Sequence, residues 1–371
     1  MKKKITISLI ILAVIVAGIA IYFAQKPKEP ETIKIGAILP LTGDMAMYGN
    51  NDKMGIDLAV EEINKSGGIN GKMVQVLYQD NQGEAKTAVS ALQKLIQDGI
   101  FIVIDDAMSS ITLSMVPVAK AKKIIIISTG ATNPQLSGIS PYFFRIWNSD
   151  AEEAIFMARY CLKEKINQIL ILYVNNDYGK GLADAFSREF TKEGGRIVEK
   201  LDFDENSRDF KSIVTRIKSY SPQYIYLIGY AAQTGIIVKQ VRELGIMAKI
   251  IGTVAMEDSK FLQLAGKSAE GVIYPFPKEP TGEASRKFKE LFKKKYNKEP
   301  ELLSDVGYDA ANLSIYAISK GARNADEVRK IFLQMTNYEG ASGIIKFDEN
   351  GDVHKPMVIK EIRNGKFQLK E

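Results

Sequence analysis

Two short polar segments carry side chains whose types and spacing suit the binding of a small anion. Residues 105–110 (DDAMSS) follow the apolar run 101–104 and open a helical pattern. Residues 128–132 (STGAT) follow four isoleucines, which predict a strand buried on both faces. Parallel sheets bind ligands at the carboxyl ends of their strands, and helix starts offer free amides to anions. We therefore expect a small-molecule site where these loops meet, although a serine at a helix start is also a common N-cap.

The chain lacks the motifs of the enzyme classes that use an alternating α/β pattern. It has no dinucleotide-binding or P-loop glycine motif, no Gly-x-Ser-x-Gly and no His-Glu-x-x-His. Asp105 and Asp106 are adjacent, and adjacent side chains on an extended segment face opposite ways, so they make a poor acid/base pair. We therefore expect no enzyme and no cofactor. An enzyme that acts through carboxylates stays open as an alternative, and it would convert a bound ligand rather than release it unchanged.

Metal and redox chemistry find little support in the composition. The single cysteine, Cys161, lies in an apolar helical pattern that predicts a buried thiol, and the single histidine, His354, lies far from it in the chain. The acidic segment 348–352 (DENGD) resembles a calcium loop, but Ile359 stands where such a loop needs glutamate. We expect no metal site and predict a hairpin turn at 348–352.

Strand and helix patterns alternate along most of the chain, which predicts a doubly wound α/β fold with parallel sheets. The second half repeats the first. In both halves a strand leads to a loop with Tyr-Gly (Tyr48, Tyr178), and an amphipathic helix and a Gly-Gly pair follow. Two lobes of similar build are the economical interpretation. The predicted helices 284–296, 305–320 and 325–336 then complete the first lobe.

The N-terminus carries a membrane signal. Residues 5–24 form an apolar segment long enough to cross a bilayer, and lysines precede it, so the rest of the chain should lie outside the cytoplasm. We predict an uncleaved N-terminal membrane anchor, with a cleaved signal peptide and a periplasmic or secreted product as the alternative. No cysteine follows the segment, which excludes a lipoprotein anchor. The chain has a net charge of +6, but its basic residues form no stripe interleaved with aromatics, which argues against nucleic acid as a partner.

From about Ile33 to the C-terminus, the chain resembles the leucine/isoleucine/valine-binding proteins of ABC importers, which are type I periplasmic solute-binding proteins. The motifs that carry the resemblance occur in the family's order: ILPLTGDMAMYG, AVEEINKSGGINGK, MSSITL, IISTGATNP, NNDYGKGLADAF, DFKSIVTRIK and YLIGYAAQTG. The resemblance implies two Rossmann-like lobes with parallel sheets, joined by three crossover segments and closing on a ligand like a hinge. The implied division is residues 1–31 for anchor and linker, 33–150 with 278–345 for lobe 1, and 151–277 with 346–371 for lobe 2.

The resemblance also implies a function and a binding site. The chain would capture a branched-chain or similar amino acid and deliver it to an ABC permease and its ATPase. Ser109 and Thr132 would hold the α-carboxylate, while the Gly130 carbonyl and the Thr132 hydroxyl would accept from the ammonium. The implied ligand-binding residues are Tyr48, Ala107, Met108, Ser109, Gly130, Ala131, Thr132, Tyr178, Tyr230 and Glu257.

One departure from the family pattern bears on the ligand. The family usually has an acid just after the strand that ends near Gly252, where it pairs with the ligand's ammonium. Here that place holds Thr253 and Val254. Either Glu257 takes over this role, or the ligand is an aromatic or aliphatic carboxylate or amide without an ammonium. A ligand-sensing receptor ectodomain is a further alternative, because the same fold serves in receptors.

Overall fold

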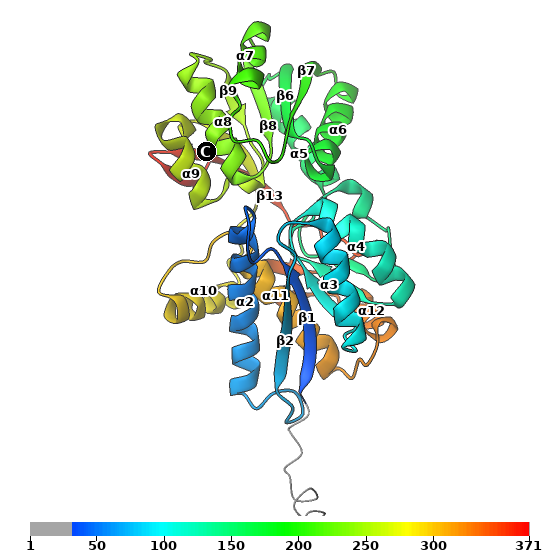
Figure 1. Cartoon of the computed structure of the whole chain (residues 1–371). Helices are drawn as coiled ribbons and strands as arrows, with labels where there is room; N and C mark the ends of the chain where they lie inside the picture. The colour runs from blue at the N-terminus through cyan, green and yellow to red at the C-terminus, as the bar shows by residue number, and fades with distance from the viewer. Residues whose placement is uncertain (1–31, 371) are drawn as a thin grey trace, which may run out of the picture.

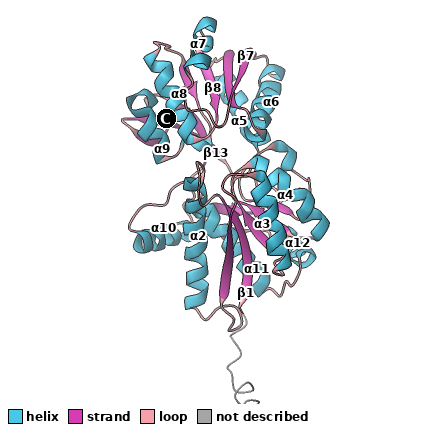
Figure 2. Ribbon diagram, viewed as in Figure 1, coloured by secondary structure: helices cyan, strands magenta, loops and turns pink. Residues whose placement is uncertain are grey.

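The structure is a computed structural model that describes residues 32–370 and folds them into two α/β lobes joined at a waist (Figure 1). Each lobe is built around one sheet flanked by helices (Figure 2). Lobe 1 contains a five-stranded sheet and lobe 2 a seven-stranded sheet. The predicted anchor at residues 5–24 lies outside the described residues. Among residues 32–370, no helix is long and apolar enough to cross a membrane.

The sheet of lobe 1 is wholly parallel, and its central strands are the continuous isoleucine and valine runs. Its strands are β1 (Ile33–Leu39), β2 (Val74–Asp80), β3 (Ile102–Asp105), β4 (Ile125–Ser128) and β5 (Phe143–Arg145), in the order β2-β1-β3-β4-β5. Every residue of β3 and β4 is buried, as expected for strands covered on both faces. Asp105 pairs with Ser128 in the register of these strands. The two polar loops that follow them therefore start side by side.

Helices from both ends of the chain cover the sheet of lobe 1. They are α2 (Ala46–Lys65), α3 (Ala85–Gln97), α4 (Ser109–Lys122), α10 (Glu283–Tyr296), α11 (Ser304–Ser319) and α12 (Ala325–Gln334). α2 and α11 approach closely at glycines. A Cβ on Gly55 would lie 2.0 Å from the Ser304 carbonyl oxygen, and one on Gly307 would lie 2.5 Å from the Asp52 carbonyl oxygen. Side chains at these positions would force the helices apart.

Lobe 2 repeats this plan with a longer, mixed sheet. Its strands are β6 (Gln168–Val174), β7 (Arg196–Phe203), β8 (Tyr224–Ile228), β9 (Lys249–Ile251), β10 (Ile273–Pro277), β13 (Met357–Arg363) and β14 (Lys366–Leu369). β6 to β10 pair in parallel, whereas β13 and β14 add antiparallel strands at the β10 edge. Its helices are α5 (Asp150–Lys163), α6 (Asp177–Lys192), α7 (Lys211–Tyr220), α8 (Ala231–Glu243) and α9 (Ser259–Ala265). The predicted fold class, two lobes with largely parallel sheets, is confirmed.

Three segments carry the chain between the lobes, after β5, after β10 and after β12. β11 (Tyr338–Gly340) and β12 (Gly343–Ile345) form a small antiparallel hairpin beside α10 and α11 in lobe 1. The third segment then leads from β12 to β13 in lobe 2. A buried ion pair ties the end of β5 to the third of these segments: Arg145 Nε lies 2.7 Å from Asp352 Oδ1, and Arg145 Nη2 lies 3.0 Å from Asp352 Oδ2.

The prediction of a hairpin turn at 348–352 is wrong. The Asp348 carboxylate accepts from the amides of Asn350 and Asp352, both at 2.9 Å, so a tight turn does form. The strands on either side of it, β12 and β13, belong to different sheets and do not pair. The turn instead lies in the third interlobe segment and presents Asp352 to Arg145. Local turn chemistry is the same in both cases, so the sequence pattern could not separate them.

Two further predictions need correction at the level of single elements. The pattern missed β5 and α9, which have only three and seven residues. It also placed Tyr48 and Tyr178 in loops, whereas both lie in the first turn of a helix, α2 and α6 respectively. The buried thiol predicted for Cys161 is confirmed, and burial raises its pKa to about 12.

Candidate functional site

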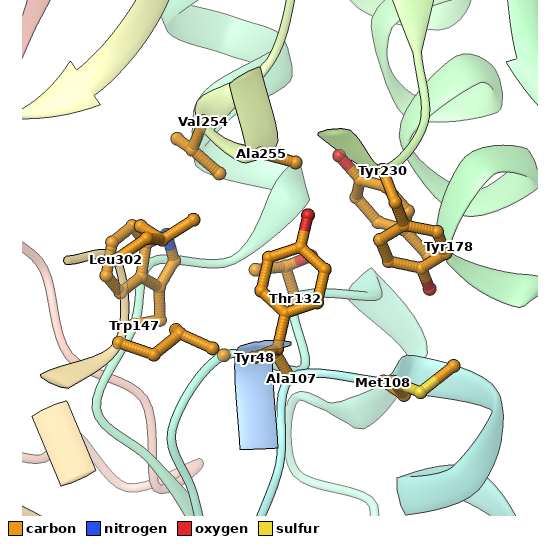
Figure 3. Close-up of a pocket in the computed structure, with 12 residues that line it drawn as sticks. Tyr48, Ala107, Met108, Thr132, Trp147, Tyr178, Tyr230, Val254, Ala255 and Leu302 are labelled. Atoms are coloured by element: carbon orange, nitrogen blue, oxygen red, sulfur yellow. The ribbon is translucent and has the colours of Figure 1, made fainter. Parts of the chain in front are cut away.

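A small, partly open cavity lies between the two lobes, at the carboxyl ends of the strands (Figure 3). Its volume, measured as space for the centres of water molecules, is about 40 Å³. Apolar and aromatic side chains dominate the wall, and none of the lining residues has an acidic or a basic side chain. The lining residues are Tyr48, Ala107, Met108, Gly130, Thr132, Trp147, Tyr178, Tyr230, Val254, Ala255, Leu302 and Leu303. Such a wall with a few polar atoms is typical of a small-molecule site.

Three tyrosines meet at the cavity because each stands at the start of a helix that follows a strand. Tyr48 lies in the first turn of α2, Tyr178 in the first turn of α6, and Tyr230 is the N-cap residue of α8. The Tyr230 ring lies 5.4 Å from the Tyr178 ring and 6.1 Å from the Tyr48 ring, measured between centroids. Burial raises the pKa of all three hydroxyls, so they stay neutral. The tyrosines form a neutral aromatic wall that spans both lobes.

The start of α4 holds donors that lie next to the cavity-lining residue Met108. Met108 is its N-cap residue, and no side chain caps the helix. The Ser109 hydroxyl oxygen accepts from the Asn133 amide at 3.2 Å, which leaves the hydroxyl proton free to donate. In the described part of the chain, the amide of Ser109 has no hydrogen-bond acceptor. A helix start without a cap favours an anionic group.

The loop after β4 supplies both a donor and an acceptor. Within residues 32–370, the Thr132 amide has no acceptor and the Gly130 carbonyl has no donor. A Cβ on Gly130 would lie 2.8 Å from the Ala107 Cβ, so only glycine lets the two polar loops pack this closely. Arg145 Nη1 holds the loop from behind by donating to the Thr132 carbonyl at 2.9 Å and the Asn133 carbonyl at 3.1 Å. The loop is therefore fixed before any ligand arrives.

Hydrogen bonds between the lobes show that the structure is the closed arrangement. The Asp177 amide donates to the Ser110 hydroxyl at 3.2 Å, and the Asn133 side chain donates to the Asp177 carbonyl at 2.6 Å. The Ala231 amide donates to the Tyr48 hydroxyl at 3.1 Å. These contacts join the starts of α4, α6, α2 and α8 across the cleft. A ligand in the cavity would touch both lobes.

The structure brings most of the predicted site residues together. Seven of them line the cavity: Tyr48, Ala107, Met108, Gly130, Thr132, Tyr178 and Tyr230. Ser109 and Ala131 are fully buried in the same two loops, next to lining residues. Glu257 lies elsewhere, because its carboxylate is paired with Lys360 and accepts from the Tyr274 hydroxyl at 2.8 Å. It does not line the cavity.

The alternative that Ser109 or Ser110 is an ordinary N-cap does not describe this helix. Both serines lie inside α4, after the N-cap residue Met108. Their hydroxyls accept from the amides of Asn133 and Asp177 instead of from their own helix. The serines thus join three separate segments around the cavity.

Sequence reasoning missed five lining residues. Trp147 follows β5, which the pattern did not show, and Ala255 lies in a three-residue 3₁₀ helix, Val254–Met256. Leu302 and Leu303 precede α11 and reach the cavity only because the chain returns to lobe 1. Leu303 has a φ of 75°, a left-handed conformation that is unusual for leucine. The family pattern had drawn attention to Val254, but only as the place of a missing acid.

No metal site was found in the described residues, where no group of three or more His, Cys, Asp or Glu side chains could hold an ion. The buried carboxylates of Asp52, Asp105 and Asp106 lie in lobe 1 and accept from neutral groups. Asp52 accepts from the Thr129 hydroxyl at 2.9 Å, and Asp106 accepts from the Asn81 amide at 2.7 Å. Burial raises the pKa of each of these carboxyls.

Two α/β lobes with a mostly apolar cavity between them are typical of solute-binding proteins. Residues 32–366 match the family described as periplasmic binding protein. A Leu/Ile/Val-binding protein homolog from Brucella melitensis is 30% identical over 328 residues, which is 87% of this chain and 89% of the relative. The chain therefore belongs to the periplasmic binding protein family, whose members bind solutes for ABC transporters and are not enzymes.

Solved structures of relatives share the whole architecture. The branched-chain amino acid transporter substrate binding protein LivJ from Streptococcus pneumoniae, in complex with isoleucine, is 29% identical with a TM-score of 0.84. The similarity covers 91% of this chain and 98% of that one. A solute-binding protein from Rhodopseudomonas palustris, in complex with 3,4-dihydroxybenzoic acid, is 25% identical with a TM-score of 0.81, over 91% of this chain and 95% of that one. Similar folds thus hold ligands with and without an amino group.

Proposed function

We propose that this protein is the extracytoplasmic solute-binding component of an ABC importer and that its ligand is a branched-chain or similar amino acid. One observation carries the proposal: backbone donors and an acceptor that have no partner among residues 32–370 lie on or beside one apolar cavity. The donors are the amides of Ser109 and Thr132, and the acceptor is the Gly130 carbonyl. An α-amino acid has a carboxylate and an ammonium on one carbon, and this set matches both groups.

The apolar wall sets the side chain of the proposed ligand. Ala107, Met108, Val254 and Leu302 line the cavity and offer no polar side-chain partner. A polar ligand side chain would lose its hydrogen bonds to water there, which costs roughly 1 to 3 kcal/mol for each group left unpaired. An aliphatic side chain gains about 0.8 kcal/mol for each buried CH₂ group. The wall therefore favours leucine, isoleucine or valine.

The second candidate is a carboxylic acid without an amine, because no lining residue carries a negative charge. The R. palustris relative with 3,4-dihydroxybenzoic acid is a precedent for such a ligand on this fold. Where an amino acid has its ammonium, such a ligand has only C–H groups. The Gly130 carbonyl and the Thr132 hydroxyl would then have no hydrogen-bond donor from the ligand. Burying acceptors unpaired is costly, so we rank this candidate second.

A thermal-shift screen separates the two candidates. A ligand present at 100 times its Kd stabilises a protein by about 2.7 kcal/mol, which raises the Tm by several degrees. We expect leucine, isoleucine or valine to raise the Tm of the purified protein, and 4-methylpentanoate, which is leucine without its amine, to raise it less. A response to 4-methylpentanoate or benzoate alone would contradict the amino-acid proposal and keep the solute-binding one.

We also propose that residues 5–24 tether the protein to the outer face of the cell membrane, next to the permease and ATPase. The lobes, residues 33–150 with 278–345 and 151–277 with 346–371, would then close on the solute outside the cytoplasm. The support is the apolar length of the segment and the lysines before it.

The tether can be tested by fractionating cells. We expect the protein in the membrane fraction. We also expect that protease added to intact spheroplasts digests the two lobes of the protein, because they lie outside the cell membrane. Replacing Ile11 and Val16 with arginine should shift the protein out of this fraction or block its export, because each charge at the bilayer centre costs roughly 2.5 to 3.5 kcal/mol. If the protein were instead found outside the membrane fraction and without its N-terminal segment, residues 5–24 would be a cleaved signal peptide.

A further inference from the structure

Asp150 is a buried carboxylate next to Thr132 that does not itself line the cavity. Its carboxylate lies close enough to the Thr132 side chain for that side chain to lower its pKa, and its amide donates to the Thr132 carbonyl at 2.8 Å. Only 1% of Asp150 is exposed, and its Oδ2 has no hydrogen-bond partner among the described residues. A carboxylate buried with an unpaired oxygen needs a physical reason.

The contact with Asp150 sets the polarity of the Thr132 hydroxyl. An ionised carboxylate can only accept hydrogen bonds, so the Thr132 hydroxyl must donate its proton to Asp150. The hydroxyl's lone pairs then remain for the cavity that Thr132 lines. Toward a ligand this hydroxyl is an acceptor, which suits an ammonium and repels a carboxylate.

Among the described residues, Asp150 forms no ion pair of its own. Arg145 on β5 lies nearby, but its guanidinium already forms the bidentate pair with Asp352. Glu153, one turn along α5, is a second buried carboxylate and accepts from the Tyr226 hydroxyl at 3.1 Å. The neutral hydroxyls of Tyr178 and Tyr226 complete the surroundings from α6 and β8. A cation in the cavity would compensate this charge.

We propose that Asp150, acting through the Thr132 hydroxyl, is the counter-charge for the ligand's ammonium and replaces the acid that is missing at Val254. Asp150 is a positioning residue, since it does not line the cavity itself. It makes the site specific for solutes with an α-amino group. The inference rests on the proposed amino-acid ligand.

The proposal predicts how affinity depends on pH. Burial raises the pKa of Asp150 to about 7, so part of the population is protonated near neutral pH without ligand. An ammonium favours the ionised form, so binding below this pKa must first remove a proton. Leucine affinity should therefore be greatest above about pH 7 and fall by up to about tenfold for each pH unit below it. An acid without an amine should show the opposite trend, because its charge favours protonated Asp150.

Asp258 offers a matched control. It is also buried, at 1% exposed, and its Oδ2 is also unpaired in the described part of the chain. Its Oδ1, however, accepts from the Lys260 amide at 2.6 Å and caps α9, a role that asparagine can keep. In the described part of the chain its carboxylate hydrogen-bonds no residue that lines the cavity, and its negative charge reaches the lining residue Tyr48 only through space.

The experiment is calorimetric titration of the wild type, Asp150→Asn and Asp258→Asn with L-leucine and 4-methylpentanoate at pH 5.5 and 8. At pH 8, Asp150→Asn should bind leucine about 10- to 100-fold more weakly than the wild type, which is the range for losing a hydrogen bond to a charged group. The leucine affinity of Asp258→Asn should stay within about threefold of the wild type. The Asp150→Asn affinity for leucine should no longer vary with pH. A Tm measured on each variant reports whether it is folded.

Four outcomes would overturn the inference. Unchanged leucine affinity in Asp150→Asn, or a wild-type affinity that is flat between pH 5.5 and 8, overturns the role of Asp150 while the amino-acid proposal stands. An equal loss in Asp258→Asn assigns the effect to overall charge rather than to the contact with Thr132. A wild type that binds 4-methylpentanoate and no amino acid overturns the proposed ligand and the inference together.

Discussion

Replacing Arg145 with methionine is expected to destabilise the protein by about 3 to 5 kcal/mol, the range for breaking a buried ion pair. Methionine keeps the length of the side chain but leaves the Asp352 carboxylate, at 5% exposed, without its cation. It also removes the donors to the carbonyls of Thr132 and Asn133. The free energy of unfolding in urea measures the loss.

Two further variants make the Arg145 result specific. The double variant Arg145→Met, Asp352→Leu removes both charges, so it should recover part of the stability that the single change loses. Lys123→Met breaks an exposed ion pair with Asp326, whose atoms lie 2.8 Å apart, and should change the stability little. A loss below about 1 kcal/mol in Arg145→Met would contradict a structural role for this pair in holding the third interlobe segment against β5.

Replacing Thr132 with alanine is expected to weaken amino-acid binding by about 1.5 to 3 kcal/mol, because the hydroxyl would accept from a charged group. Stability should change much less than affinity, since Arg145 and the Asp150 amide hold the loop through its backbone carbonyls. Calorimetric titration with leucine measures the effect.

Thr132→Ser is the matched control for this change, because it keeps the hydroxyl and removes only a methyl group. Its affinity should stay close to that of the wild type. If alanine and serine at this position gave the same affinity as threonine, Thr132 would be removed from the proposed site.

The fold was predictable because the buried parallel strands leave a clear pattern. The isoleucine run that became β4 and the valine and isoleucine run that became β3 are continuous, and a helix of 14 residues, α4, lies between them. Short elements carry no such signal, so β5 was missed. The pairing partner of a strand is also set by tertiary contacts. The turn at 348–352 therefore looked like a hairpin although it connects two sheets.

The candidate site was predictable where a local motif reaches the cavity. Gly130, Thr132 and Tyr178 stand in segments whose sequence resembles the family pattern, and the structure places them on one wall. Leu302 and Leu303 reach the cavity from a distant part of the chain, and no local pattern marks them. Asp150 follows a serine N-cap and reads as an ordinary acidic residue at a helix start. Only its position behind Thr132 gives it a possible role, and that position requires the structure.

The most direct test of the proposed site is a crystal structure of the protein grown with L-leucine. The proposal predicts the ligand carboxylate at the start of α4, within hydrogen-bond distance of the amides of Ser109 and Thr132. It predicts the ammonium against the Gly130 carbonyl and the Thr132 hydroxyl, with the side chain against Met108. A leucine with its ammonium at the start of α4, or bound outside this cavity, would contradict the proposal.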